Sequence, residues 1–380
     1  MGGVGKREKR ESDSGVGRRA ERDEALATGP TALNKAKHQT FAFIFESNCP
    51  ICRGGMNSSF KAAGESSLGA CLNFTGLTMH SLSSIPEYAV RVRLNKHGIS
   101  IDKGAGRAVN RVKVPLSNGR CMQTSLDREG MKLVMHPYPH VDYYDQAAVV
   151  ATYYAQLRQI IMENIEGARD AIVAHHQVRS HKKDILQGGT GMPKDPVHFC
   201  HCDYSLAGGY SYLRRLGEST HSSTTVLSQE DIEYYSTTGR FMIVHAWRNI
   251  SPRLPVQSNP LALCCANTVH DDDLVAYDLC YDQRTDGVMA IKHNSAQQWL
   301  YFPDMVRDEL LIFKQFDSIS PTIRRHSLVA VNTSPDAASE TVSCWVPHSS
   351  FENSNDMPKD KELSPPAGRE TIEAAVVVLF

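Results

Sequence analysis

The stretch PVHFCHCDYS (196–205) has the alternating pattern of a β-strand. Side chains two positions apart on a strand point to the same face. His201 and Asp203 therefore share one face, and Cys200 and Cys202 share the other. Because a histidine and an aspartate on one face can bind a single cation, the stretch predicts a strand that carries half of a metal site.

The spacing His-x-Asp occurs three times in the chain, so its context has to be considered. His140 lies in a proline-rich approach to a helix, and His270 lies in the acidic stretch VHDDD, which is typical of a solvated turn. Only His201 and Asp203 lie in an apolar, strand-like segment. For these two residues the alternative is a buried, hydrogen-bonded pair without a metal.

Further strand-like segments follow this stretch and are separated by loops rich in Pro, Asn, Asp and Ser. They are RFMIVHAWR (240–248), DLVAYDLCY (273–281), GVMAIKH (287–293), QQWLYF (297–302), ELLIFKQF (309–316), HSLVAV (326–331) and TIEAAVVVLF (371–380). About eight short strands in one block favour a closed or double-sheet β architecture.

Helical periodicity is found in two places. Apolar residues recur at three- and four-residue steps between Tyr143 and Gly167, which predicts an amphipathic helix that ends at a glycine. The following segment DAIVAHHQV (170–178) predicts a strand. SQEDIEYY (228–235) predicts a short helix with Ser228 as its N-cap.

Composition divides the chain into three parts. Residues 1–40 are charged and almost free of large apolar residues, which predicts a disordered tail. Residues 41–85 have no clean period and are an unassigned extension. Residues 86–380 form one β-rich domain, in which the polar, aperiodic segment at about 338–368 predicts a long loop or an insertion.

The overall charge is nearly balanced, with 41 Lys and Arg against 42 Asp and Glu. This balance favours a small neutral or weakly acidic substrate over nucleic acid or a membrane surface. No apolar run approaches the roughly 20 residues of a membrane helix, and the first residues lack the apolar core of a signal peptide. We therefore expect a cytoplasmic protein whose 10 cysteines are reduced.

Eight segments, taken in order, resemble one family. They are LDREGMKLVMHP (126–137), YYDQAAVVATYYAQL (143–157), PVHFCHCDYS (196–205), GRFMIVHAWRNI (239–250), PVQSNPLALC (255–264), QQWLYF (297–302), DELLIFKQFDS (308–318) and RETIE (369–373). Through them the chain resembles the fungal Fe(II)/2-oxoglutarate-dependent hydroxylases and desaturases of secondary metabolism. These enzymes are related to gibberellin desaturase and to cephalosporin methoxylase-associated proteins.

The resemblance implies a mostly β fold with flanking helices and a double-stranded β-helix (jelly-roll) core. It also implies that His201 and Asp203 are the first two ligands of Fe(II). The distal ligand is expected after the FDS segment, where His326 stands on a predicted strand, with His293 in reserve. Two histidines and one carboxylate leave positions on the iron open for a keto acid and O₂.

The distal carboxylate of 2-oxoglutarate needs a cation, and the planar fork of arginine can bind both of its oxygens. The resemblance suggests Arg369, at the start of the last strand, for this role. Arg248, directly after Trp247, is a second candidate.

We therefore expect an oxygenase that hydroxylates or desaturates a small secondary metabolite. One alternative is a catalytically impaired jelly-roll binding protein, motivated by the segment 338–368 and by departures from the family pattern at Cys265 and Gln297. The other is a metal-dependent hydrolase that binds zinc through the same His and Asp.

Overall fold

The computed structural model describes residues 68–75, 90–93, 109–137, 141–180, 196–218, 227–281, 284–326, 342–352 and 368–380. The chain divides into two units, residues 1–40 and 41–380, and every described residue belongs to the second. The predicted disordered tail (1–40) and most of the unassigned extension (41–85) lie outside the described residues.

One sheet has five antiparallel strands in the order β4-β12-β7-β14-β5. These strands are β4 (Met131–Met135), β12 (Glu309–Asp317), β7 (Phe241–Asn249), β14 (Glu370–Leu379) and β5 (Asp170–Ser180). Nearly all residues of the three central strands are buried, so both faces of this part of the sheet are covered.

The second sheet has nine strands in the order β1-β3-β11-β8-β13-β6-β10-β9-β2. The pairs β11 with β3 and β2 with β9 are parallel, and the others are antiparallel. The strands are β1 (Leu68–Thr75), β3 (Val109–Asn118), β11 (Trp299–Tyr301), β8 (Leu261–Cys264), β13 (His348–Ser350), β6 (His201–Cys202), β10 (Thr285–Ile291), β9 (Leu274–Cys280) and β2 (Val90–Arg93).

Two strands, β1 and β13, lie in segments for which the sequence predicted no strand. β1 lies within the part of the sequence that was left unassigned and pairs along its whole length with β3. β13 lies within the segment 338–368, which was interpreted as a loop or an insertion.

The core lies between the two sheets. Phe241 and Ile243 of β7 and Phe316 of β12 pack in one cluster with Ala262 of β8 and Met289 of β10. Two curved sheets that pack face to face over buried apolar residues confirm the predicted jelly roll.

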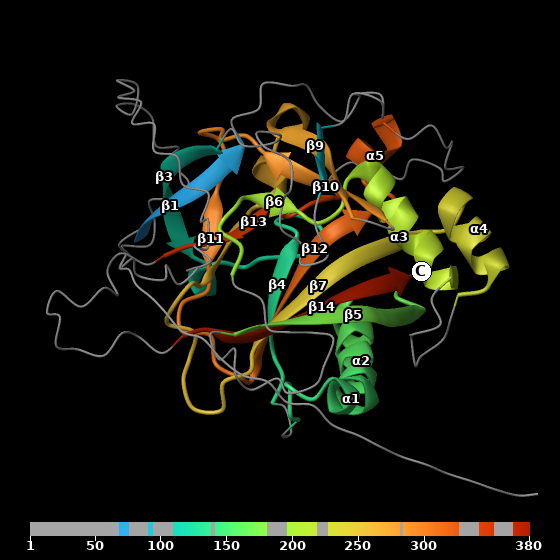
Figure 1. Cartoon of the computed structure of the whole chain (residues 1–380), viewed down its shortest axis with the longest axis horizontal. Coiled ribbons are helices and arrows are strands. Elements are labelled where there is room, and N and C mark those ends of the chain that lie inside the picture. Colours follow the sequence, from blue (N-terminus) through green and yellow to red (C-terminus); the bar gives the residue numbers. More distant parts are fainter. Residues whose placement is uncertain are drawn as a thin grey trace, which may run out of the picture. The chain divides into compact units, whose positions relative to one another are not determined.

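A helical segment covers the outer face of the five-stranded sheet, below β5 and β14 in Figure 1. It consists of α1 (Gln146–Ala148), a π-helical turn η4 (Val149–Tyr153) and α2 (Tyr154–Asn164). The predicted amphipathic helix is thereby confirmed, and Gly167 just beyond it has a φ of 76° that favours glycine.

Three further helices lie in unit 2 among the described residues, and Figure 1 shows α3 and α4 side by side. In α4 (Gln229–Thr237), Ser228 caps the first turn together with Asp231, as predicted. α3 (Leu206–Glu218) was not predicted. A Cβ at Gly208 would come 2.1 Å from the carbonyl oxygen of Gly287 in β10, so α3 can lie this close to the sheet only with glycine there.

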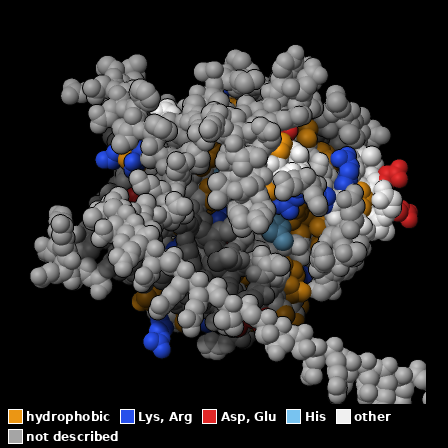
Figure 2. All heavy atoms as spheres, viewed as in Figure 1, with side chains coloured by type: hydrophobic (Ala, Val, Ile, Leu, Met, Phe, Trp, Pro, Cys, Tyr) orange, Lys and Arg blue, Asp and Glu red, His pale blue; other side chains and the backbone are white. Residues whose placement is uncertain are grey.

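α5 (Pro321–His326) completes the α-helices, and the short 3-10 turns are η3 (Gly119–Cys121), η5 (Ala266–Thr268) and η6 (Asp271–Asp273). None of the helices in the described ranges is long and apolar enough to cross a membrane. On the face drawn in Figure 2, acidic side chains gather where α4 lies, while hydrophobic and basic side chains lie next to a visible histidine.

Candidate metal centre

The segment around β6 separates its side chains as the sequence predicted, although only His201 and Cys202 form the strand itself. Cys200 and Cys202 are fully buried in the core, whereas the side chains of His201 and Asp203 keep 15% and 30% of their surface accessible. The Nε2 atom of His201 lies 3.5 Å from Oδ1 of Asp203. The histidine and the aspartate therefore converge on one point.

β13 adds a third residue to this pair. His348 is the direct register partner of His201 across the two strands, and the centroids of the two rings are 4.4 Å apart. The Nε2 atom of His348 lies 3.4 Å from Oδ2 of Asp203. His201, Asp203 and His348 thus present three ligand atoms that all lie within 4.8 Å of one another.

Backbone carbonyls orient both imidazole rings. Nδ1 of His201 lies 2.6 Å from the carbonyl oxygen of Phe199, and Nδ1 of His348 lies 3.2 Å from that of Val346. Each Nδ1–H donates to a carbonyl two residues earlier, so in the neutral ring Nε2 keeps its lone pair. The ring orientation directs both Nε2 atoms toward Asp203, and the tautomer leaves their lone pairs available, as in histidines that bind metals.

Asp203 carries the charge of the cluster. Burial alone would raise its pKa, but the charge of His245 and the hydrogen bond with His201 hold the pKa well below its ordinary value. Its Oδ2 atom is buried and accepts no hydrogen bond from the described residues. Since a buried carboxylate oxygen without a donor is unfavourable, a cation at this point would stabilise it.

Burial, reinforced by His201, lowers the pKa of His348 to about 4. The ring is therefore neutral at pH 7, which is the form that binds a metal ion.

A second pair, His245 of β7 and Glu373 of β14, adjoins Asp203 and was not predicted from the sequence. Nδ1 of His245 lies 2.6 Å from Oε1 of Glu373 and 3.4 Å from Oδ2 of Asp203. Burial opposes the charge on His245, but the carboxylates of Asp203 and Glu373 raise its pKa. His245 in turn lowers the pKa of Glu373 and keeps it ionised. Because the short contact to Glu373 is a direct hydrogen bond, we assign the two residues as an ion pair beside the cluster.

Arg369 lies directly before β14 and is 5% exposed. Its Nη1 donates to Oγ of Ser350 at 2.7 Å and to the carbonyl oxygen of Asn259 at 2.8 Å, while the guanidinium lies over the ring of Trp247. Burial lowers the pKa of Arg369 to about 9, so the group is still charged at pH 7. Ser350 and His348 are two residues apart on β13, so this strand links the guanidinium of Arg369 to the cluster.

Arg248 lies on the face of β7 that points away from the cluster. It is fully buried, its Nη2 lies 3.3 Å from the carbonyl oxygen of His136, and its guanidinium faces the ring of Tyr153. His245 and Trp247 point toward the core between the sheets, while Arg248 points toward the helical cover. The alternation of the strand thus separates Arg248 from the cluster.

The other histidines considered from the sequence lie elsewhere. His326 ends α5 instead of lying on the predicted strand, and its side chain is outside the described part of the structure. His293 packs edge-on against Phe74 and takes no part in the cluster. His140 lies outside the described residues.

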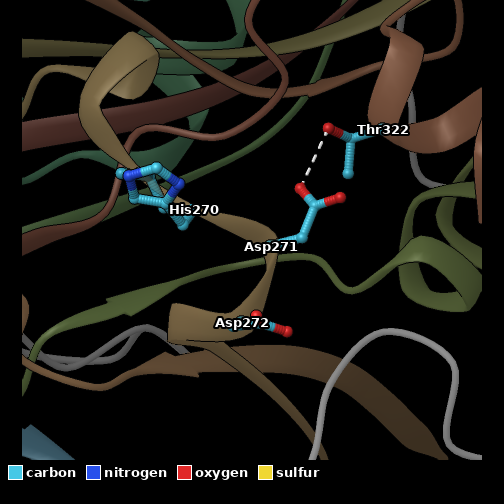
Figure 3. Close-up of a pocket in the computed structure, with 5 residues that line it drawn as sticks. His270, Asp271, Asp272 and Thr322 are labelled. Atoms are coloured by element: carbon cyan, nitrogen blue, oxygen red, sulfur yellow. Dashed lines mark hydrogen bonds between the residues drawn. The ribbon is translucent and has the colours of Figure 1, made fainter.

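His270 lies at a surface turn, as predicted. It caps η6, and its backbone N–H donates to Asp273. In Figure 3, His270 and Asp272 point in different directions, while Asp271 accepts a hydrogen bond from Thr322 at 3.2 Å. These residues line a hollow of about 400 Å³, but they do not bring a histidine and a carboxylate together.

A family model described as oxidoreductase/YMDC permease-like domain (YDMC) matches residues 83–379, which include every residue of the cluster. The chain belongs to this family. Its fold resembles that of the iron and alpha-ketoglutarate-dependent endoperoxidase NvfI, with a TM-score of 0.59 over 82% of this chain and 98% of that one. The identity is 18%, so this likeness concerns the fold alone.

Curated relatives of this YDMC-family chain are fungal. Alpha-ketoglutarate-dependent dioxygenase phiK of a fungal species is 26% identical over 53% of this chain and 69% of its own length. Hydroxylase/desaturase efuI of Hormonema carpetanum is 27% identical over 51% and 67%. Hydroxylase/desaturase asaB of Aspergillus flavus is 35% identical over 21% and 39%. These relatives confirm the resemblance drawn from the sequence.

Proposed function

We propose that the protein is an Fe(II)/2-oxoglutarate-dependent oxygenase that hydroxylates or desaturates a small metabolite. The observation that carries the proposal is the convergence of His201, Asp203 and His348, with both Nε2 atoms directed at the carboxylate. The relatives named as a dioxygenase and as a hydroxylase/desaturase support the same chemistry.

The donor set favours iron. Two imidazole nitrogens and one carboxylate oxygen on one side of an ion are the ligands of non-haem Fe(II) oxygenases, whereas thiolates would favour zinc or a cluster. Cys200 and Cys202 point away from the site. The buried Oδ2 of Asp203, which lacks a hydrogen bond from the described residues, fits the charge of the cation.

We assign the third ligand to His348 in preference to His326. His348 is paired directly with His201, and its Nδ1 is held by Val346. His326 ends a helix, and no described contact links it to β6.

We assign the 2-oxoglutarate clamp to Arg369. Its guanidinium is buried and charged, and no ion pair joins it to a carboxylate in the described part of the chain. The distal carboxylate of 2-oxoglutarate would supply the missing negative charge. Arg248 faces the helical cover, so it is not part of this assignment.

Bound Fe(II) and 2-oxoglutarate would supply the activation of O₂ that makes a C–H bond of the substrate reactive. In this chain, His201, Asp203 and His348 would bind the iron, and Arg369 would orient the keto acid. Hydroxylation and desaturation use the same ligands, and the shape of the substrate pocket selects between them. A cytoplasmic location and the absence of a nucleic-acid partner stay predictions from the sequence.

The test is an anaerobic titration of the full-length protein with Fe(II) and then 2-oxoglutarate, followed by visible spectroscopy. The parent protein and His326→Ala should develop a charge-transfer band, whereas His348→Ala should not. Loss of the band in His326→Ala alone would return the third ligand to His326. A parent protein that shows no band and binds Zn(II) tightly would favour the hydrolase, and one that binds no metal would favour the binding protein.

A further inference from the structure

Gln315 is a fully buried polar residue near the C-terminal end of β12. The register between β12 and β7 shifts between Lys314 and Phe316, so Gln315 has no partner in β7. A bulge of this kind redirects a side chain out of the regular alternation. Here it sends the amide of Gln315 toward the metal-binding cluster.

The amide joins two segments that are far apart in the sequence. Its Oε1 accepts the backbone N–H of Asp203 at 2.8 Å, and its Nε2 donates to the carbonyl oxygen of Val346, also at 2.8 Å. The backbone N–H can only donate and the carbonyl can only accept, so the orientation of the amide is defined. One side chain thus connects Asp203, directly after β6, with the segment that leads to His348.

The carbonyl of Val346 also orients His348. It accepts Nδ1–H of that ring at 3.2 Å, and Nε2 of Gln315 lies 3.5 Å from the same Nδ1. A shift of Val346 would therefore turn the imidazole and move its Nε2 away from Asp203.

We propose that Gln315 is a positioning residue of the metal centre, which sets the separation of Asp203 and His348. This inference rests on the proposed metal site and adds a residue that is not one of its three ligands but contacts the backbone of Asp203 and Val346. An amide suits the role because it contains both a hydrogen-bond acceptor and two N–H donors, whereas an ionised carboxylate contains only acceptors.

A buried glutamine away from the cluster provides a matched control. Gln297 is 9% exposed, and its Nε2 donates to Oδ2 of Asp273 at 3.1 Å and to the carbonyl oxygen of Lys292 at 2.8 Å. Methionine has nearly the same volume as glutamine but makes none of these hydrogen bonds. Gln315→Met and Gln297→Met should therefore lower the melting temperature of the metal-free protein to similar extents.

The experiment is a titration of the full chain with Co(II), which avoids reaction with O₂ and has ligand-field absorption that reports the coordination geometry. Because residues that orient ligands typically change metal affinity by about 10- to 100-fold, Gln315→Met should raise the Kd for Co(II) by that factor and alter the spectrum. Gln297→Met should leave both unchanged. Gln315→Glu keeps the acceptor for Asp203 but loses the donor to Val346, and it should also weaken binding.

Three results would overturn the proposal. If the parent and Gln315→Met bound Co(II) equally and with the same spectrum, Gln315 would have no positioning role, while the proposed metal site would stand. If Gln297→Met lost as much affinity for Co(II) as Gln315→Met, the loss would reflect a general decrease in stability and not a positioning role. If the parent bound neither Co(II) nor Fe(II), the proposed metal centre itself would fail.

Discussion

Replacing Arg369 with alanine tests the assignment of the 2-oxoglutarate clamp. The guanidinium is buried, and hydrogen bonds to Ser350 and Asn259 already hold its planar fork in place. The variant removes the cation but leaves His201, Asp203 and His348 unchanged. We therefore expect the variant to bind Fe(II) normally and to bind 2-oxoglutarate weakly.

The magnitude follows from the burial of Arg369. Loss of one partner from a desolvated, charge-assisted contact costs about 2 to 5 kcal/mol. Since about 1.4 kcal/mol corresponds to a factor of ten, the lower limit predicts that the Kd for 2-oxoglutarate rises by about 30-fold or more. Arg369→Lys should recover part of this loss, because it restores the charge without the fork.

The assay is an anaerobic titration of the Fe(II)-loaded variants with 2-oxoglutarate, with the charge-transfer band as the signal. Melting curves of the metal-free variants show whether each one is folded. If Arg369→Ala bound 2-oxoglutarate as tightly as the parent protein, the assignment of the clamp to Arg369 would be wrong.

Three further predictions concern the metal pair, a buried ion pair and the N-terminal segment. His201→Ala should abolish Fe(II) binding in a metal titration, while His270→Ala should leave it unchanged, and the reverse result would select the other His-x-Asp pair. Asp317→Asn should lower the free energy of unfolding in urea by about 3 kcal/mol, because it breaks a fully buried contact with Lys314. Burial opposes ionisation of Asp317, but Lys314 and Arg240 lower its pKa below the ordinary 3.8, so its contribution is complete above that pH and is lost as the pH falls further. Acid unfolding of the variant should therefore be less steep, and an unchanged profile would contradict this account. Deletion of residues 1–40 should leave the melting temperature nearly unchanged, because the charged composition of this segment predicts little burial, and a large decrease would show that it docks on the domain.

Features that depend on nearby residues in the chain could be predicted from the sequence. The alternation around His201 predicted which side chains face the core, and the helical period after Tyr143 predicted the helix that covers the five-stranded sheet. Ser228 predicted the start of α4, because capping depends on a residue three positions away. The apolar run TIEAAVVVLF predicted a strand, and the structure has β14 there.

The sequence did not predict which distant residues meet at the metal centre, because this depends on how the strands pair. His348 lies on a strand of three residues within a polar segment, too short for any periodicity, and only its pairing with β6 places it opposite His201. His245 and Glu373 are 128 residues apart and meet because β7 and β14 are neighbours in the sheet. Gln315 contacts the backbone of Asp203 because of a β-bulge, and the local sequence pattern does not predict this bulge. Register, strand order and bulges depend on contacts between segments far apart in the sequence, so the pattern of one segment predicts its exposed and buried faces but not its partners.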